Sequence, residues 1–116
     1  MQEEDSAIFD LFGRGNRTTM MEAVAEKGKN PGVCIIDVRT RQEFSCGHVP
    51  GALNVPLDQI GQVQELVPDK SAPVYLYCAS GGRSMMAAGM LKRMGYEGAA
   101  NVGGIGGYTG PLDTGA

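Results

Sequence analysis

Short apolar runs alternate with amphipathic segments along most of the chain. The run 33–38 is nearly continuous and rich in β-branched residues, as is typical of a strand buried on both faces of a parallel sheet. The predicted strands are 33–38, 52–55, 74–78 and 96–102, and the predicted helices begin near residues 19, 40, 57 and 84. This alternation of strands and helices predicts an α/β domain with a mainly parallel sheet.

Local signals define the ends of several predicted helices. Thr19 and Thr40 each open the S/T-x-x-E spacing of a capping box, which is typical of a helix start. A third helix is predicted from Leu57, weakened by Gly61 and stopped by Pro68. The fourth helix is expected to bury a face made of Met86, Ala87, Met90, Leu91 and Met94.

The length of 116 residues fits one domain with a core of its own, so we predict a single domain over 1–116. Residues 1–16 form an N-terminal extension in which only the apolar patch Ile8–Phe12 could pack as a helical turn. The glycine-rich region after Val102 favours little regular structure, and residues 109–116 are predicted to be a flexible tail.

Charge excludes two classes of partner. The formal net charge is -3 and no cluster of Lys or Arg stands out, so neither nucleic acid nor an anionic membrane surface is an expected partner. The acidic start Met1–Asp5 does not resemble a signal peptide, and no run has transmembrane length. We therefore expect a soluble, cytoplasmic protein.

The chain has three cysteines and one histidine, with no CxxC pair. This set offers no zinc site, so no metal and no cofactor is predicted. Cys34 lies within an apolar run and is interpreted as core, whereas Cys46 lies in a loop where it could be exposed. Free thiols fit this pattern better than a disulfide framework.

Cys78 lies where a predicted strand meets a predicted helix, next to backbone N–H groups that have no partner within the helix. Such a position binds anions and favours a thiolate, and the small loop leaves the sulfur accessible. A buried structural cysteine is the alternative. The candidate anion-binding residues that follow it are Ala79, Ser80, Gly81, Gly82, Arg83 and Ser84.

The chain resembles a rhodanese domain over roughly residues 33 to 108. Several motifs occur in the order and spacing of that family, although Tyr108 stands where rhodaneses often have a tryptophan. The motifs are Ile36–Arg39, Glu43-Phe44, Gly47–Ala52, Asn54–Pro56 and Tyr77-Cys78 with its loop.

The resemblance implies an α/β/α sandwich with a five-stranded parallel sheet. It also implies that Cys78 is the nucleophile and carries sulfane sulfur as a persulfide, from an anionic donor such as thiosulfate to a thiophilic acceptor such as cyanide or a thiol. A protein sulfur acceptor is a further possible partner.

Three polar residues are assigned supporting roles. In the resembling family, the motifs that contain Asp37, Arg39 and His48 hold the loops beneath the site. Arg39 is expected to pair with Glu43. A Cys–His dyad between His48 and Cys78 is the alternative, but a thiolate stabilised by its loop needs no general base.

Two other functions stay open at this point. Phosphatases and arsenate reductases share the fold, but their loop from cysteine to arginine spans seven residues, whereas Cys78 to Arg83 spans six. The other is a persulfide carrier or regulatory module that acts on a protein partner.

Overall fold

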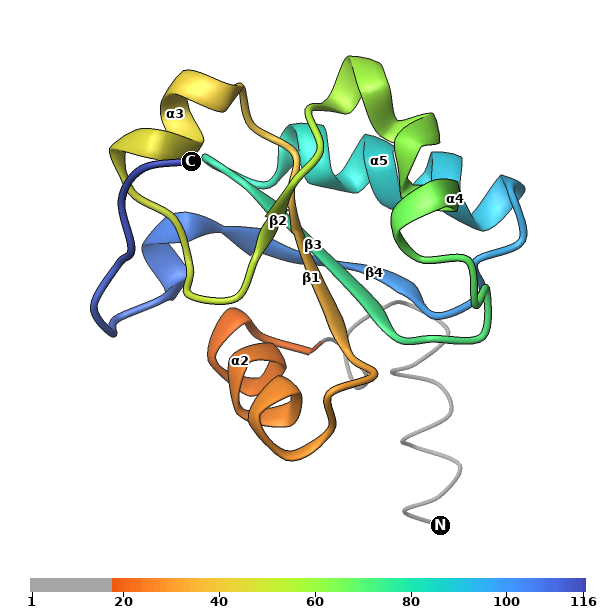
Figure 1. Cartoon of the computed structure of the whole chain (residues 1–116), viewed down its shortest axis with the longest axis horizontal. Coiled ribbons are helices and arrows are strands. Elements are labelled where there is room, and N and C mark those ends of the chain that lie inside the picture. The colour runs from red at the N-terminus through yellow and green to blue at the C-terminus, as the bar shows by residue number, and fades with distance from the viewer. Residues whose placement is uncertain (1–17) are drawn as a thin grey trace, which may run out of the picture.

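The computed structural model describes residues 18–116. Its strands form a parallel sheet in the order β2-β1-β3-β4, with bounds Leu53–Asn54, Cys34–Asp37, Val74–Cys78 and Ala99–Gly104. Helix α2 (Met20–Lys29) covers one face, and α4 (Val63–Leu66) and α5 (Gly82–Arg93) lie on the other side (Figure 1). This three-layer α/β/α arrangement confirms the predicted fold class.

The sheet has four strands within residues 18–116. A fifth strand, implied by the resemblance, is therefore not confirmed by the described part of the chain. The patch Ile8–Phe12 and the extension 1–16 lie outside the described residues.

Two helices begin where their capping boxes predict. In α2, the Glu22 amide donates to Thr19 Oγ1 over 3.1 Å and the Thr19 amide donates to Glu22 Oε1 over 2.9 Å. Thr40 and Glu43 form the same reciprocal pair ahead of α3 (Arg41–Cys46). Each box satisfies backbone donors that the first helical turn leaves without partners, which explains why so local a signal locates both helix starts.

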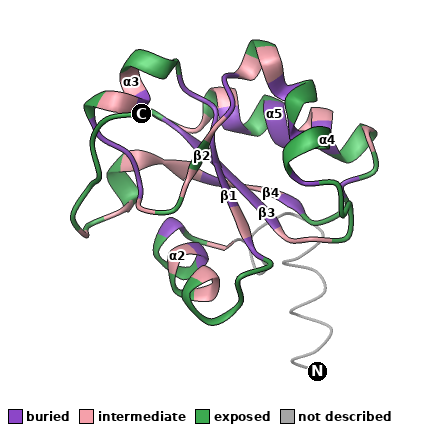
Figure 2. Ribbon diagram, in the orientation of Figure 1, coloured by how far each residue is buried: buried purple, intermediate pink, exposed green. Residues whose placement is uncertain are grey.

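Successive residues of the central strands enter two different cores. On β1, Ile36 packs with the side that carries α4 and α5, whereas Ile35 packs with α2. All five residues of β3 are buried, which matches its continuous apolar sequence (Figure 2). Strand β3 is thus held between helices on both faces, and its last residue is Cys78.

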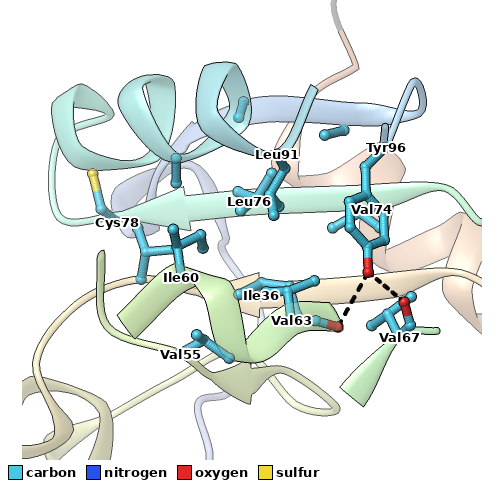
Figure 3. Packing of buried hydrophobic residues seen from close by; sticks show 14 residues of the cluster. Ile36, Val55, Ile60, Val63, Val67, Val74, Leu76, Cys78, Leu91 and Tyr96 are labelled. Carbon is cyan, nitrogen blue, oxygen red and sulfur yellow. Dashed lines mark hydrogen bonds between the residues drawn. The ribbon is translucent and has the colours of Figure 1, made fainter. Parts of the chain in front are cut away.

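Tyr96 closes the larger core at the end opposite Cys78 (Figure 3). Its hydroxyl donates to the Val67 carbonyl over 2.6 Å and lies 3.4 Å from the Val63 carbonyl. The last strand, predicted over 96–102, instead runs over Ala99–Gly104. Tyr96 therefore precedes the strand and anchors the turn to the segment that carries α4.

Two helix predictions were wrong in detail. The predicted helix from Leu57 is a 3-10 helix, η1 (Leu57–Gln62), followed by the four-residue α4, because Gln59 breaks the helical backbone with φ -120° and ψ 23°. On α5, Met86 is 59% exposed. The other members of the predicted face lie at the core: Ala87 and Leu91 are buried, and Met90 and Met94 are partly buried against the same cluster.

The predicted flexible tail contacts the rest of the domain. Asp113 and His48 exchange two backbone hydrogen bonds of 2.9 Å, and the Gly115 amide donates to the Ser45 carbonyl. The flexibility of 109–116 stays a prediction. A short 3-10 turn, η2 (Ile105–Gly107), precedes this segment.

In the part of the chain that the structure describes, no helix has the length and apolar character needed to cross a bilayer.

Candidate active site

Cys78 is the last residue of β3, and α5 begins at Gly82. The intervening turn directs backbone N–H groups at the sulfur: the Gly81 amide donates to Cys78 Sγ over 3.0 Å and the Ser84 amide over 3.4 Å. Gly81 has φ +103°, a conformation that residues with a Cβ rarely adopt. Gly81 thus permits the turn that brings its own amide to the sulfur.

The end of β4 supports this turn from beneath. Gly104 pairs with Cys78 in the parallel ladder. A Cβ on Gly104 would collide with the Ala79 carbonyl oxygen and lie 3.0 Å from Ser80 Cα. The backbone of the turn therefore rests directly on a glycine of the neighbouring strand.

Burial and hydrogen bonding act on the sulfur in opposite directions. Cys78 is 1% exposed, so the sulfur is not as accessible as the small loop suggested, and this burial raises the thiol pKa. The amides of Ser84, Gly81 and Ser80 act in the opposite direction. If the Ser84 hydroxyl also donates to the sulfur, these hydrogen bonds together outweigh burial and lower the thiol pKa from 9.0 to about 7. Hydrogen bonds to the charged form favour the thiolate.

Arg83 is paired with a carboxylate. Its guanidinium donates to Glu43 through Nη1 over 2.9 Å and through Nη2 over 3.2 Å, which ties α5 to α3. The two side chains are 36% and 37% exposed. The bond from Arg83, together with the Thr40 amide, lowers the pKa of Glu43 to about 2. An anion that binds Arg83 must therefore compete with Glu43 or share the guanidinium with it.

The expected pair between Arg39 and Glu43 is wrong, because each has a different partner. Arg39 Nη2 donates to Asp37 Oδ2 over 2.7 Å and to the Gly47 carbonyl over 2.6 Å. Asp37 also accepts the Arg39 amide over 2.9 Å, and all of these groups are buried. The pair joins the end of β1 to the loop after α3, which is a supporting position of the kind predicted for both residues.

His48 packs with α3. Its Nδ1 lies 2.8 Å from the Phe44 carbonyl oxygen, and its ring stacks on Phe44 with centroids 3.6 Å apart. No hydrogen bond among residues 18–116 joins His48 to Cys78. The geometry therefore favours the structural interpretation of His48 over the dyad.

The other two cysteines differ from Cys78 in their surroundings. Cys34 is half-buried, and burial raises the pKa of its thiol. Cys46 is exposed at the end of α3. Only Cys78 has two backbone amides directed at its sulfur among the described hydrogen bonds.

The six loop residues predicted to bind an anion differ in how far they are exposed. Ala79, Ser80 and Gly82 are exposed, whereas Ser84 is fully buried and its hydroxyl lies 3.4 Å from Cys78 Sγ. Asn101 was not predicted as part of the site, yet its amide contacts Ser84. A polar residue two positions before the Gly103-Gly104 pair, in a strand predicted to lie beside the cysteine strand, was the signal that could have indicated it.

Comparison with known proteins agrees with this geometry. A family model described as "Rhodanese-like domain" matches residues 19–110. Thiosulfate sulfurtransferase PspE of Escherichia coli is 39% identical over 71 residues, which are 60% of this chain and 68% of that one. Human thiosulfate:glutathione sulfurtransferase is 29% identical over 83 residues, covering 60% of this chain and 72% of that one.

A solved structure described as a rhodanese with anions from E. coli has a TM-score of 0.67 and 36% identity, covering 71% of this chain and 98% of that one. Some relatives are longer: the chain spans 19%, 48% and 36% of three others. The similar proteins named above include sulfurtransferases, so family-level transferase activity is supported.

Proposed function

Because the chain belongs to the family of rhodanese-like domains, we propose that it transfers sulfane sulfur through a persulfide on Cys78. The observation that carries the proposal is the sulfur at the end of β3 with the amides of Gly81 and Ser84 directed at it. These donors stabilise negative charge on the thiolate without a general base.

The proposed reaction has two displacement steps. The Cys78 thiolate attacks the outer sulfur of thiosulfate, a bond forms between the two sulfurs, and the sulfur–sulfur bond of the donor breaks with sulfite leaving with the electron pair. A second thiolate, or cyanide, then attacks the outer sulfur of the persulfide. The Cys78 thiolate leaves with the electron pair of that bond, so no external oxidant or reductant is needed.

Charge supports an anionic donor. Arg83 is the charged residue of the cysteine loop, and the exposed Ala79 and Ser80 present little bulk beside it. Glu43 offsets part of the charge of Arg83, so the backbone amides of the loop and the guanidinium together are the proposed donors for the anion. Thiosulfate is the proposed donor, and a low-molecular-weight thiol is the proposed acceptor.

The alternatives have less support. Four residues separate Cys78 from Arg83, and a loop this short leaves less room for a tetrahedral phosphate or arsenate. A purely regulatory module would not require the amides that face Cys78. A protein sulfur acceptor and a cytoplasmic location stay predictions from the sequence.

Steady-state transfer from thiosulfate to cyanide, measured beside hydrolysis of an aryl phosphate, separates these classes. We expect sulfur transfer by the wild type, none by Cys78→Ser because its oxygen forms no persulfide, and negligible phosphate hydrolysis by either. A phosphatase rate above the sulfur-transfer rate would reverse the ranking. Circular dichroism confirms that the variant is folded.

A further inference from the structure

The side-chain amide of Asn101, on β4, has a fixed orientation. One end lies 2.9 Å from the Gly103 N–H, which can only donate, and the other lies 3.3 Å from the Gly81 carbonyl, which can only accept. The oxygen must therefore face Gly103 and the NH₂ group must face Gly81, because the reverse would oppose like groups at both ends.

This orientation decides where the Ser84 hydroxyl proton lies. Ser84 Oγ lies 2.6 Å from Asn101 Oδ1, 3.2 Å from the Gly81 carbonyl oxygen and 3.4 Å from Cys78 Sγ. Two oxygens at 2.6 Å need a proton between them, and Asn101 Oδ1 has none. A hydroxyl has a single proton, so Ser84 donates it to Asn101 and presents lone pairs to the sulfur.

We propose that Asn101 is a positioning residue that withholds the Ser84 hydroxyl proton from Cys78, so that backbone amides alone hold the thiolate. The proposal rests on the proposed function, in which Cys78 is the nucleophile. It assigns Ser84 the opposite role from the one its proximity suggests: its oxygen accepts a hydrogen bond from the neutral thiol.

The consequence for catalysis concerns nucleophilicity. A thiolate that receives fewer hydrogen bonds is more basic, and nucleophilicity falls as the thiol pKa falls. With the hydroxyl held by Asn101, only the backbone amides oppose the effect of burial, so the pKa of Cys78 lies above the value that it would have with the hydroxyl as a further donor. Once ionised, such a thiolate attacks a donor faster than a thiolate that also receives a hydrogen bond from the hydroxyl, because it is more basic.

The charged groups around the sulfur do not depend on Asn101. Arg83 approaches from α5 with Glu43 of α3 as its partner, and Asp37 and Arg39 form a closed pair at the end of β1. Strand β4 contributes no ionisable side chain. A change in the Cys78 pKa on substitution of Asn101 therefore reports on the hydroxyl or on the amides of the loop.

A double-mutant cycle separates those two causes. In Asn101→Ala the hydroxyl is released, and a thiolate is a stronger acceptor than the Gly81 carbonyl, so we expect the Cys78 pKa to fall by about one unit. In a Ser84→Ala background the same substitution should change the pKa by less than about half a unit. An equal fall in both backgrounds would overturn the proposal, because the effect would then pass through the loop.

Ser84→Ala alone gives a test that does not need the Asn101 variant to fold. If Ser84 only accepts from the thiol, the pKa stays within about half a unit of the wild type or falls. A larger rise would mean that the hydroxyl donates to the thiolate and would overturn the proposal.

The pKa is measured by thiolate absorbance in Cys34→Ser/Cys46→Ser chains, with the matching Cys78→Ser chain as the blank. This readout needs no access to the buried sulfur and no sulfur donor. An inactive protein with the expected pKa pattern would count against the proposed function alone, and an active protein without it would count against Asn101 alone.

Discussion

Replacement of Glu43 by glutamine tests how far its pair with Arg83 restrains capture of the donor. Glu43 Oε1 also accepts the Thr40 amide over 2.9 Å in the capping box of α3. Glutamine keeps an oxygen at that position, so the cap survives, while the charge and the second oxygen, which accepts from Arg83 Nη2, are lost. Glu43→Gln is therefore a cleaner perturbation than truncation to alanine.

The expected size of the effect follows from exposure. The side chains of Arg83 and Glu43 are 36% and 37% exposed. An ion pair with this much exposure to solvent contributes at most about 1 kcal/mol to stability. A donor that engages Arg83 must overcome this attraction. Its removal should therefore raise kcat/KM for thiosulfate by up to about fivefold, mainly through KM. Added salt should reduce the gain, because it screens both the ion pair and the donor.

The assay is steady-state transfer from thiosulfate to cyanide. Glu97→Gln is the matched control, because it makes the same change in net charge. Glu97 precedes β4 and therefore lies at the end of the sheet where the parallel strands β3 and β4 begin, whereas Cys78 lies where β3 ends. The pKa of the Glu43 carboxyl is lowered from 4.5 to about 2. The stabilisation from its ion pair with Arg83 is therefore fully present above the pKa of the unfolded chain and is lost only as the pH falls through about 2.

The ratio of variant to wild-type kcat/KM should therefore stay constant between about pH 5 and pH 8. A folded Glu43→Gln protein with lower kcat/KM than both the wild type and the control would refute the reasoning. Glu43 would then hold Arg83 in its productive position.

Three further predictions concern the loop and the core. Arg83→Ala should lower kcat/KM for thiosulfate by roughly a hundredfold and Arg83→Lys by less; equal losses would show that the guanidinium geometry, not its charge, is needed. Gly104→Ala should cost about 1–3 kcal/mol of stability and reduce transfer, because its Cβ collides with the Ala79 carbonyl, whereas Gly106→Ala, with open space around it, should change neither in thermal melts and activity assays. Tyr96→Phe should lower stability by about 1 kcal/mol with kcat/KM unchanged; an altered kcat/KM would link the two ends of the core.

The features predicted well from the sequence are those set by neighbours in the chain. Both capping boxes use residues three positions apart, and the fully apolar β3 predicts its own burial on both faces. The turn after Cys78 was also predictable, since glycines at 81 and 82 permit it.

Long-range contacts were not predictable in the same way. Glu43 has Arg83 as its partner across 40 positions, and nothing in the local sequence distinguishes Arg83 from the nearer Arg39. Met86 was placed in the core because helical periodicity locates the border of a buried face only approximately: α5 buries Ala88 beside Ala87 and Leu91 and leaves Met86 exposed. The contact of Asn101 with Ser84 depends on how β4 pairs with β3.

Single-turnover loading of Cys78 tests the central claim most directly. The protein is incubated with thiosulfate, desalted and digested. The masses of the peptides that contain Cys34, Cys46 and Cys78 are then measured by mass spectrometry, with and without treatment with cyanide. The account predicts one added sulfur atom on the Cys78 peptide alone, its loss to cyanide as thiocyanate, and no loading of the folded Cys78→Ser protein. A folded wild-type protein that gains no sulfur, or gains it on Cys34 or Cys46 instead, would contradict the account.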